Sequence, residues 1–89
     1  MSTEITIVYS DEAQLKNVRD IIDMSLTFTF LDTTTSKGKK KGWALKSHWG
    51  AKLDPFVVIT EDKIPKKVFY SEDKINPIDS LIKWLKEEY

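Results

Sequence analysis

An unbroken apolar run in the middle of the chain, Phe56-Val57-Val58-Ile59, is the feature that most constrains the fold. Strands with one face in water alternate apolar and polar residues, whereas a continuous run is expected where a strand is covered on both faces. In a small domain, helices packed on the sheet provide that cover. The chain of 89 residues is long enough for one such domain, which we expect to span residues 1–89.

Two segments before this run also have strand patterns. Glu4–Tyr9 is rich in β-branched and aromatic residues, with Ile5, Ile7 and Tyr9 on one face. Leu26–Leu31 alternates apolar residues with threonine, which predicts a strand with one face toward the core. The residues expected on that face are Leu26, Phe28 and Phe30. We expect these two strands to be parallel and joined by a right-handed crossover.

A hairpin and a helix are predicted after the apolar run. The strand Phe56–Thr60 is followed by the turn Glu61–Pro65 and a second strand, Lys66–Ser71, and so short a link favours antiparallel pairing. Asn76 is a good helix N-cap and Pro77 suits the first helical position. The stripe of the helix that follows consists of Ile78, Leu81, Ile82 and Leu85, with Trp84 at its edge.

Two further helices are predicted between strands. Ser10 or Asp11 can cap a helix that runs to Met24. Its apolar residues recur at helical spacing and are Leu15, Val18, Ile21 and Ile22. A shorter helix is indicated within Trp43–Lys52, with Gly50 near its end. The order of elements is therefore β-α-β-(α)-β-β-α, which predicts an α/β domain with helices packed on a four-stranded mixed sheet.

Charge is distributed unevenly along the chain. The 14 basic and 14 acidic residues give a formal net charge of zero, but the stretch from Thr33 to Lys52 contains six lysines and no acid. Within it, Ser36–Gly42 is predicted to be a basic loop, with glycines at both ends of the lysine run. The neutral total argues against polyanion binding over the whole surface and leaves a local basic site open.

The order of elements resembles that of the thioredoxin and glutaredoxin family. Ile7-Val8-Tyr9-Ser10 before a helix is similar to the family's first strand, which leads into the redox helix. Leu53-Asp54-Pro55-Phe56-Val57-Val58 is similar to the segment in which a cis-proline opens the third strand, and the final hairpin and helix are similar to the family's C-terminal part. The resemblance covers nearly the whole chain and implies a thioredoxin-like fold. For Pro55, cis and trans bonds remain equal alternatives, because a trans proline can also open a strand.

The redox motif of that family is missing. Counting from Tyr9, the two cysteines of the C-x-x-C motif correspond to Gln14 and Asn17, and the chain has no cysteine. Disulfide exchange needs a thiolate, which an amide cannot replace. The resemblance therefore implies a redox-inactive, non-catalytic interaction module of the kind found among bacterial and phage accessory proteins. Its groove between the first helix and the Pro55 loop would bind an extended partner.

The stretch from the lysine run to Pro55 contains the candidate binding residues. Lysines neutralise anionic groups, and neighbouring tryptophans can stack on bases or hold a partner. The alternative interpretation is a solvated loop whose tryptophans pack into the core. The candidates are Lys37, Lys39, Lys40, Lys41, Trp43, Lys46, His48, Trp49, Asp54 and Pro55. We expect an acidic protein surface or peptide as the partner, and nucleic acid is the alternative.

No other chemistry is indicated by the sequence. His48 would need a pocket to act as an acid or base, and as a structural residue it would hydrogen-bond near Trp49 and Asp54. One histidine and no cysteine exclude zinc sites built from several such ligands, and the C-terminal acids lack the spacing of calcium loops. We expect no metal, no cofactor, no membrane-spanning segment and a cytoplasmic location. The pattern predicts no particular oligomeric state.

Overall fold

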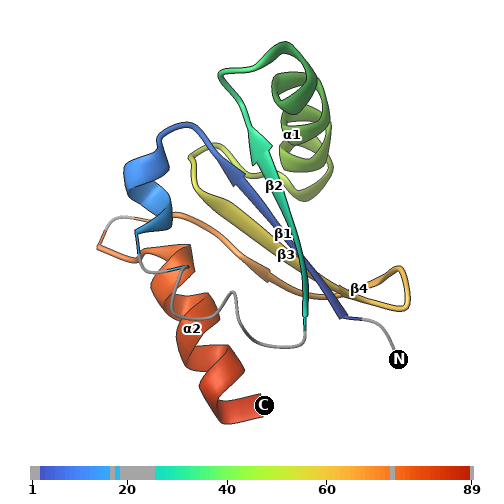
Figure 1. Cartoon of the computed structure of the whole chain (residues 1–89), viewed down its shortest axis with the longest axis vertical. Coiled ribbons are helices and arrows are strands. Elements are labelled where there is room, and N and C mark those ends of the chain that lie inside the picture. Colours follow the sequence, from blue (N-terminus) through green and yellow to red (C-terminus); the bar gives the residue numbers. More distant parts are fainter. Residues whose placement is uncertain (1–2, 17, 19–25, 73, 89) are drawn as a thin grey trace.

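The computed structural model describes residues 3–16, 18, 26–72 and 74–88, and its centre is a four-stranded mixed sheet (Figure 1). The strands are β1 (Thr3–Tyr9), β2 (Thr27–Asp32), β3 (Phe56–Glu61) and β4 (Ile64–Phe69), arranged in the order β2-β1-β3-β4. β1 and β2 are parallel, whereas β3 is antiparallel to both β1 and β4. The four predicted strands, the parallel first pair and the hairpin are therefore confirmed. The turn is shorter than predicted, because Ile64 and Pro65 already belong to β4, which ends at Phe69 instead of Ser71.

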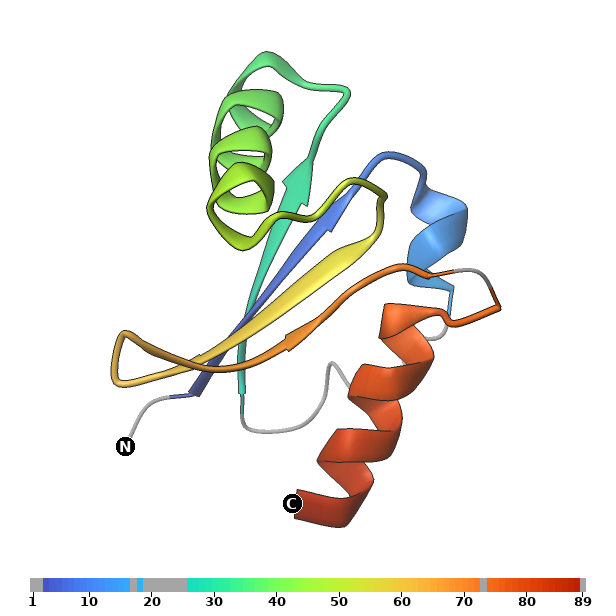
Figure 2. The same cartoon turned by 180° about the vertical axis from the view of Figure 1, so that it is seen from behind.

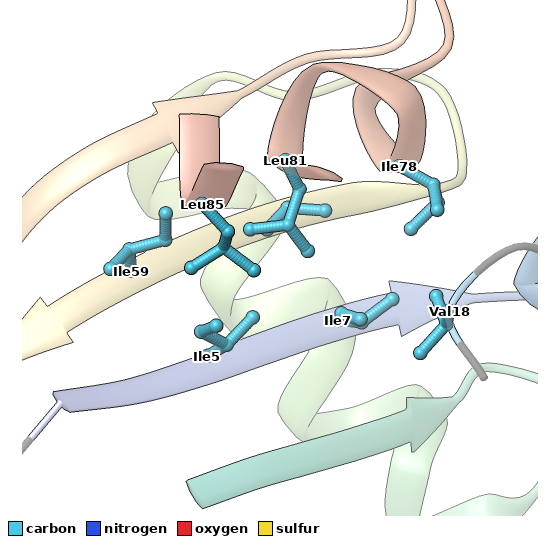
Figure 3. Packing of buried hydrophobic residues seen from close by; sticks show 8 residues of the cluster. Ile5, Ile7, Val18, Ile59, Ile78, Leu81 and Leu85 are labelled. Atoms are coloured by element: carbon cyan, nitrogen blue, oxygen red, sulfur yellow. The ribbon is translucent and has the colours of Figure 1, made fainter. Parts of the chain in front are cut away.

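Helix α2 (Pro77–Glu88) covers one face of this sheet. Its first turn is capped as predicted, because the Ile78 N–H donates to Asn76 Oδ1 at 2.9 Å. Its apolar stripe packs on alternate residues of β1 and β3 (Figure 3). The fully buried cluster on this face consists of Ile5, Ile7, Val18, Val57, Ile59, Ile78, Leu81 and Leu85.

Helix α1 (Ser36–Trp49) covers the opposite face, where the other alternate residues of β1 and β3 point (Figure 2). The buried residues there are Val8, Phe56 and Val58, and Leu45 and Trp49 of α1 pack against them. All four residues of the apolar run are at most 2% exposed. The inference that this strand is covered on both faces is confirmed.

The lysine run is part of α1, so the predicted basic loop is wrong. Thr35 caps the helix, since its hydroxyl accepts from the Gly38 N–H at 3.0 Å. Gly38 and Gly42 are four residues apart on the buried side, where a Cβ on Gly38 would overlap the backbone of Asp32. These glycines permit a close approach of helix and strand, instead of forming turns at the ends of a loop. The predicted helix within Trp43–Lys52 is the second half of α1, which ends at Gly50 with a φ of 71°.

The segment after β1 begins with a short 3-10 helix, η1 (Glu12–Leu15), capped by Asp11. Half of the helix predicted to reach Met24, including Asn17, lies outside the described residues. In β2, Leu26 and Phe28 pack against the α2-side cluster as expected, but Phe30 is 38% exposed. The prediction that Phe30 is a core residue is wrong, because it lies on an edge strand and beyond the cluster that α2 covers. None of the described helices is long and apolar enough to cross a membrane.

Candidate functional site

The outer side of α1 carries four lysines, Lys37, Lys39, Lys40 and Lys41, which we call the basic face of α1. All four are exposed, and none forms an ion pair with a residue that the structure describes. The helix contains no acidic residue. Lysines near a helix N-terminus oppose the macrodipole, so this arrangement does not stabilise α1. Residues that lower the stability of the element that carries them are typical of functional surfaces.

The two tryptophans of α1 have different environments. Trp43 is 56% exposed, and the Nζ of Lys39 lies 4.6 Å from the centre of its ring, a cation–π distance. Trp49 packs against the sheet, with His48 edge-on to its ring at 5.1 Å. Trp49 therefore packs into the core, as the alternative interpretation expected, whereas Trp43 lies on the surface.

Lys46 is the lysine of α1 that is neutralised within the fold. Its Nζ lies 2.8 Å from Oδ1 of Asp54, with the two side chains 13% and 16% exposed. The contact is ionic, since Oδ1 has no hydrogen bond of good geometry. The other carboxylate oxygen of Asp54 accepts from the Thr33 hydroxyl at 3.5 Å. This pair ties α1 to the loop before β3, so Lys46 is not available to a partner in the way that the sequence predicted.

The loop at Pro55 also contacts η1. The Asp54–Pro55 peptide bond is cis, and Pro55 is buried. Gln14 Oε1 accepts from the N–H groups of Ser10 and Asp11 at 2.9 and 3.2 Å, and its Nε2 donates to the Asp54 carbonyl at 3.5 Å. One amide therefore caps η1 and bridges it to the loop. The groove expected between the first helix and Pro55 is crossed by this side chain.

A pocket of about 660 Å³ lies beside η1. Tyr9 of β1 and Phe30 of β2, in edge-to-face contact at 6.5 Å, form its sheet side. The rest of its lining comes from Glu12, Ala13, Leu15, Lys16 and Val18. Sequence reasoning missed this pocket, because the alternation of β2 placed Phe30 in the core and carried no sign that the strand lies at the edge.

Two titratable groups near this end of the sheet are shifted. Burial, and then the negative charges of Asp32 and Glu12, raise the pKa of Tyr9 above its usual value. The pKa of Asp32 is lowered, because its carboxylate accepts hydrogen bonds from the hydroxyl and the N–H of Thr34 at 2.6 and 2.9 Å. The phenol of Tyr9 therefore stays neutral and Asp32 stays charged across the physiological range.

Neither Asp54 nor the pocket beside η1 contacts His48. The ring is exposed, and Asp54 contacts Lys46 and Thr33 instead of the histidine. The pocket beside η1 is lined by other residues. Within the described part of the chain, no three His, Asp or Glu side chains converge as metal ligands would.

Comparisons with known proteins add no template for this site. No family model matches the sequence, and no curated protein matches it either.

Proposed function

We propose that this protein is a non-catalytic binding module, built on a thioredoxin-like fold, whose α1 helix recognises an acidic segment of a partner protein. The observation that carries the proposal is the basic face of α1: four exposed lysines on a helix that contains no acid, none of them in an ion pair with a described residue. Uncompensated charge of one sign steers and selects partners of the opposite sign.

The thioredoxin-like part of the proposal is supported by topology. The sheet order is β2-β1-β3-β4 with only the first pair parallel, α1 and α2 lie on opposite faces, and Pro55 precedes β3. The redox-inactive part is supported by Gln14, which replaces the first cysteine expected from the resemblance. Its amide caps η1 and contacts Asp54, and neither role involves a nucleophile.

An acidic protein segment fits the charge pattern better than a nucleic acid does. The basic face is confined to one helix of a chain with zero net charge, so a long polyanion would also meet the acidic remainder of the surface. The chain has a single arginine, Arg19, whereas bidentate phosphate and base recognition favours arginine. Lysine ammonium groups attract carboxylates as point charges without that geometry.

The experiment is a binding titration with a fluorescently labelled glutamate-rich peptide at low salt. The test variant, Lys37→Ala/Lys40→Ala/Lys41→Ala, removes three charges from the basic face. The matched control, Lys52→Ala/Lys83→Ala/Lys86→Ala, removes the same charge elsewhere.

We expect the test variant to bind about tenfold more weakly, because three exposed ion pairs of about 0.5 kcal/mol each sum to that factor. The control should change the affinity by less than about twofold. An equal loss in both variants would mean that net charge, and not the α1 surface, determines binding, and the proposal would be wrong.

Single-stranded nucleic acid is the second candidate ligand, and one observation favours it. Trp43 is exposed beside Lys39, an arrangement on which a base can stack. An oligonucleotide that binds with a steep salt dependence, and more than about tenfold more weakly to Trp43→Ala, would establish this function. No binding at low salt would remove it.

A further inference from the structure

The two edges of the sheet are protected to different degrees. Unpaired edges bind other strands, and proteins block them with lysines, prolines and bulges. The edge strand β4 has all three devices: Pro65, two lysines, and a shift in its pairing with β3 at Ile59/Thr60. The other edge strand, β2, reads Thr-Phe-Thr-Phe-Leu-Asp, with no proline, no lysine and no shift in its pairing with β1.

The outward backbone of β2 is unpartnered. Thr27–Leu31 pair with β1, and no other hydrogen bond of their backbone involves a described residue. Only at the end of the strand does the backbone bond elsewhere among the described residues: the carbonyl of Asp32 accepts from the Thr35 N–H, in the turn into α1, at 3.1 Å. Within the described part of the chain, the strand therefore offers a row of free donors and acceptors, the requirement for addition of a further strand.

Each face of the sheet offers different chemistry beside this edge. On the α2 face, Phe30 is exposed and, with Tyr9, borders the 660 Å³ pocket. A strand added to β2 would point every second side chain toward this face. An apolar or aromatic side chain fits there, because the ring of Phe30 leaves apolar surface open to water.

On the other face, α1 packs against β2 (Figure 1). The side chain of Lys46 points toward Asp54, in the loop before β3. Because β3 lies on the other side of β1 from β2, Lys46 is on the flank of α1 that faces away from the β2 edge. At about 100° per residue, Lys37 lies about 180° and Lys41 about 140° around the helix from Lys46. These two lysines are therefore on the flank nearer the β2 edge, where acidic side chains of an added strand would meet them.

We propose that the acidic partner binds as an extended segment that adds a strand to the β2 edge. Its acidic residues alternate with apolar ones, so that the acids face α1 and the apolar side chains face Phe30 and Tyr9. This inference rests on the proposed function and adds the binding mode and the sequence pattern of the partner. Main-chain hydrogen bonds supply affinity in this mode, and the alternate side chains supply specificity.

A second copy of the chain fits this edge less well. Symmetric pairing of two β2 strands in one continuous sheet would place both α1 helices on the same face. Each helix carries four lysines that form no ion pair with the residues described, so the two basic faces would repel one another. Charge complementarity therefore favours an acidic peptide as the occupant.

The test uses two synthetic peptides of the same composition with the full-length protein. In one, glutamate alternates with valine and phenylalanine; in the other, the same residues are grouped into an acidic block and an apolar block. We expect the alternating peptide to bind about tenfold more tightly and to slow hydrogen exchange of the amides in β2 while leaving those in β4 unchanged.

Two matched variants test the apolar side of the edge. Phe30→Ala removes an exposed ring from β2, and Ile64→Ala removes a 69% exposed side chain from β4. We expect Phe30→Ala to weaken the alternating peptide about tenfold without affecting the blocked peptide, and Ile64→Ala to affect neither.

The outcomes separate this inference from the proposed function. If both peptides bind equally and β2 exchange is unchanged, the strand-addition mode is wrong while acidic recognition by α1 stands. If neither acidic peptide binds, the proposed function fails as well. Protection of β2 that grows with protein concentration in the absence of peptide would identify a second copy as the occupant and would overturn the inference.

Discussion

Replacing Gly38 by alanine tests directly whether α1 lies on β2 as described. In a solvent-exposed helix this substitution is stabilising by about 1 kcal/mol, because alanine has the higher helix propensity. At Gly38 the added Cβ would overlap the carbonyl oxygen of Asp32, with the carbonyl carbon and nitrogen of the same residue 2.8 Å away. All three atoms belong to the backbone, so no rotation of a side chain can relieve the overlap.

The magnitude follows from two opposing terms. Inserting a methyl group into a packed contact costs about 1–3 kcal/mol, and the upper end applies where the obstacle is backbone. Subtracting the propensity gain of about 1 kcal/mol leaves a net destabilisation of about 2 kcal/mol. Gly42→Ala should cost less, because its nearest neighbours are the side-chain methyls Val8 Cγ1 at 3.0 Å and Thr33 Cγ2 at 3.2 Å.

The assay is urea unfolding followed by tryptophan fluorescence, since Trp49 packs between α1 and the sheet. Ala44→Gly is the matched control: Ala44 is exposed on the same helix, so this substitution measures the propensity term alone and should cost about 1 kcal/mol. The expected order of stability is wild type above Ala44→Gly, and Ala44→Gly above Gly38→Ala.

A different order of stability would mean that α1 does not pack on β2 as described. If the lysine run were a loop, Ala44→Gly would have little effect, and Gly38→Ala would be neutral or stabilise the protein by about 0.5 kcal/mol through the unfolded chain. If α1 formed without approaching β2, Ala44→Gly would still be destabilising, but Gly38→Ala would stabilise. Only close packing makes both substitutions unfavourable.

Three further predictions concern single contacts. Because the pKa of Tyr9 is raised, the neutral phenol stabilises the fold fully below the usual tyrosine pKa of about 10, and this stabilisation is lost as the pH rises through the raised pKa. Tyr9→Phe should therefore reduce the loss of stability at alkaline pH, measured by urea titrations. Asp32→Asn should lower the pKa of Tyr9, measured by an ultraviolet absorbance titration. Lys46→Ala should cost about 2 kcal/mol by leaving the mostly buried Asp54 carboxylate without its cation, and the double variant with Asp54→Ala should recover part of that loss; additive losses would contradict a direct pair. Asn76→Ala should cost about 1 kcal/mol by removing the cap of α2, while Asn76→Asp, which keeps an acceptor oxygen, should retain most of the stability.

Much of the fold could be predicted because local patterns and tertiary structure agree. The alternation in β1, the apolar run of β3 and the capped stripe of α2 each determine both an element and the face that it buries. The order of elements then leaves few topologies, since parallel strands require a crossover and short links require hairpins. The candidate site was predicted less completely: the lysines were found, but not the helix that presents them.

The sequence alone therefore identifies the four strands, the C-terminal helix, the covered sheet and the concentration of positive charge before Pro55. The role of the glycines beside the lysines depends on tertiary structure, because a glycine permits either a turn or a close contact between helix and strand. Only the position of the Asp32 backbone against Gly38 shows that the contact is the role in this protein. Tertiary structure also decided that Lys46 is paired and that Phe30 is exposed. The pairing of Lys46 depends on the loop that lies beside α1, and the exposure of Phe30 depends on the position of β2 at the edge of the sheet. Local periodicity does not encode these long-range positions.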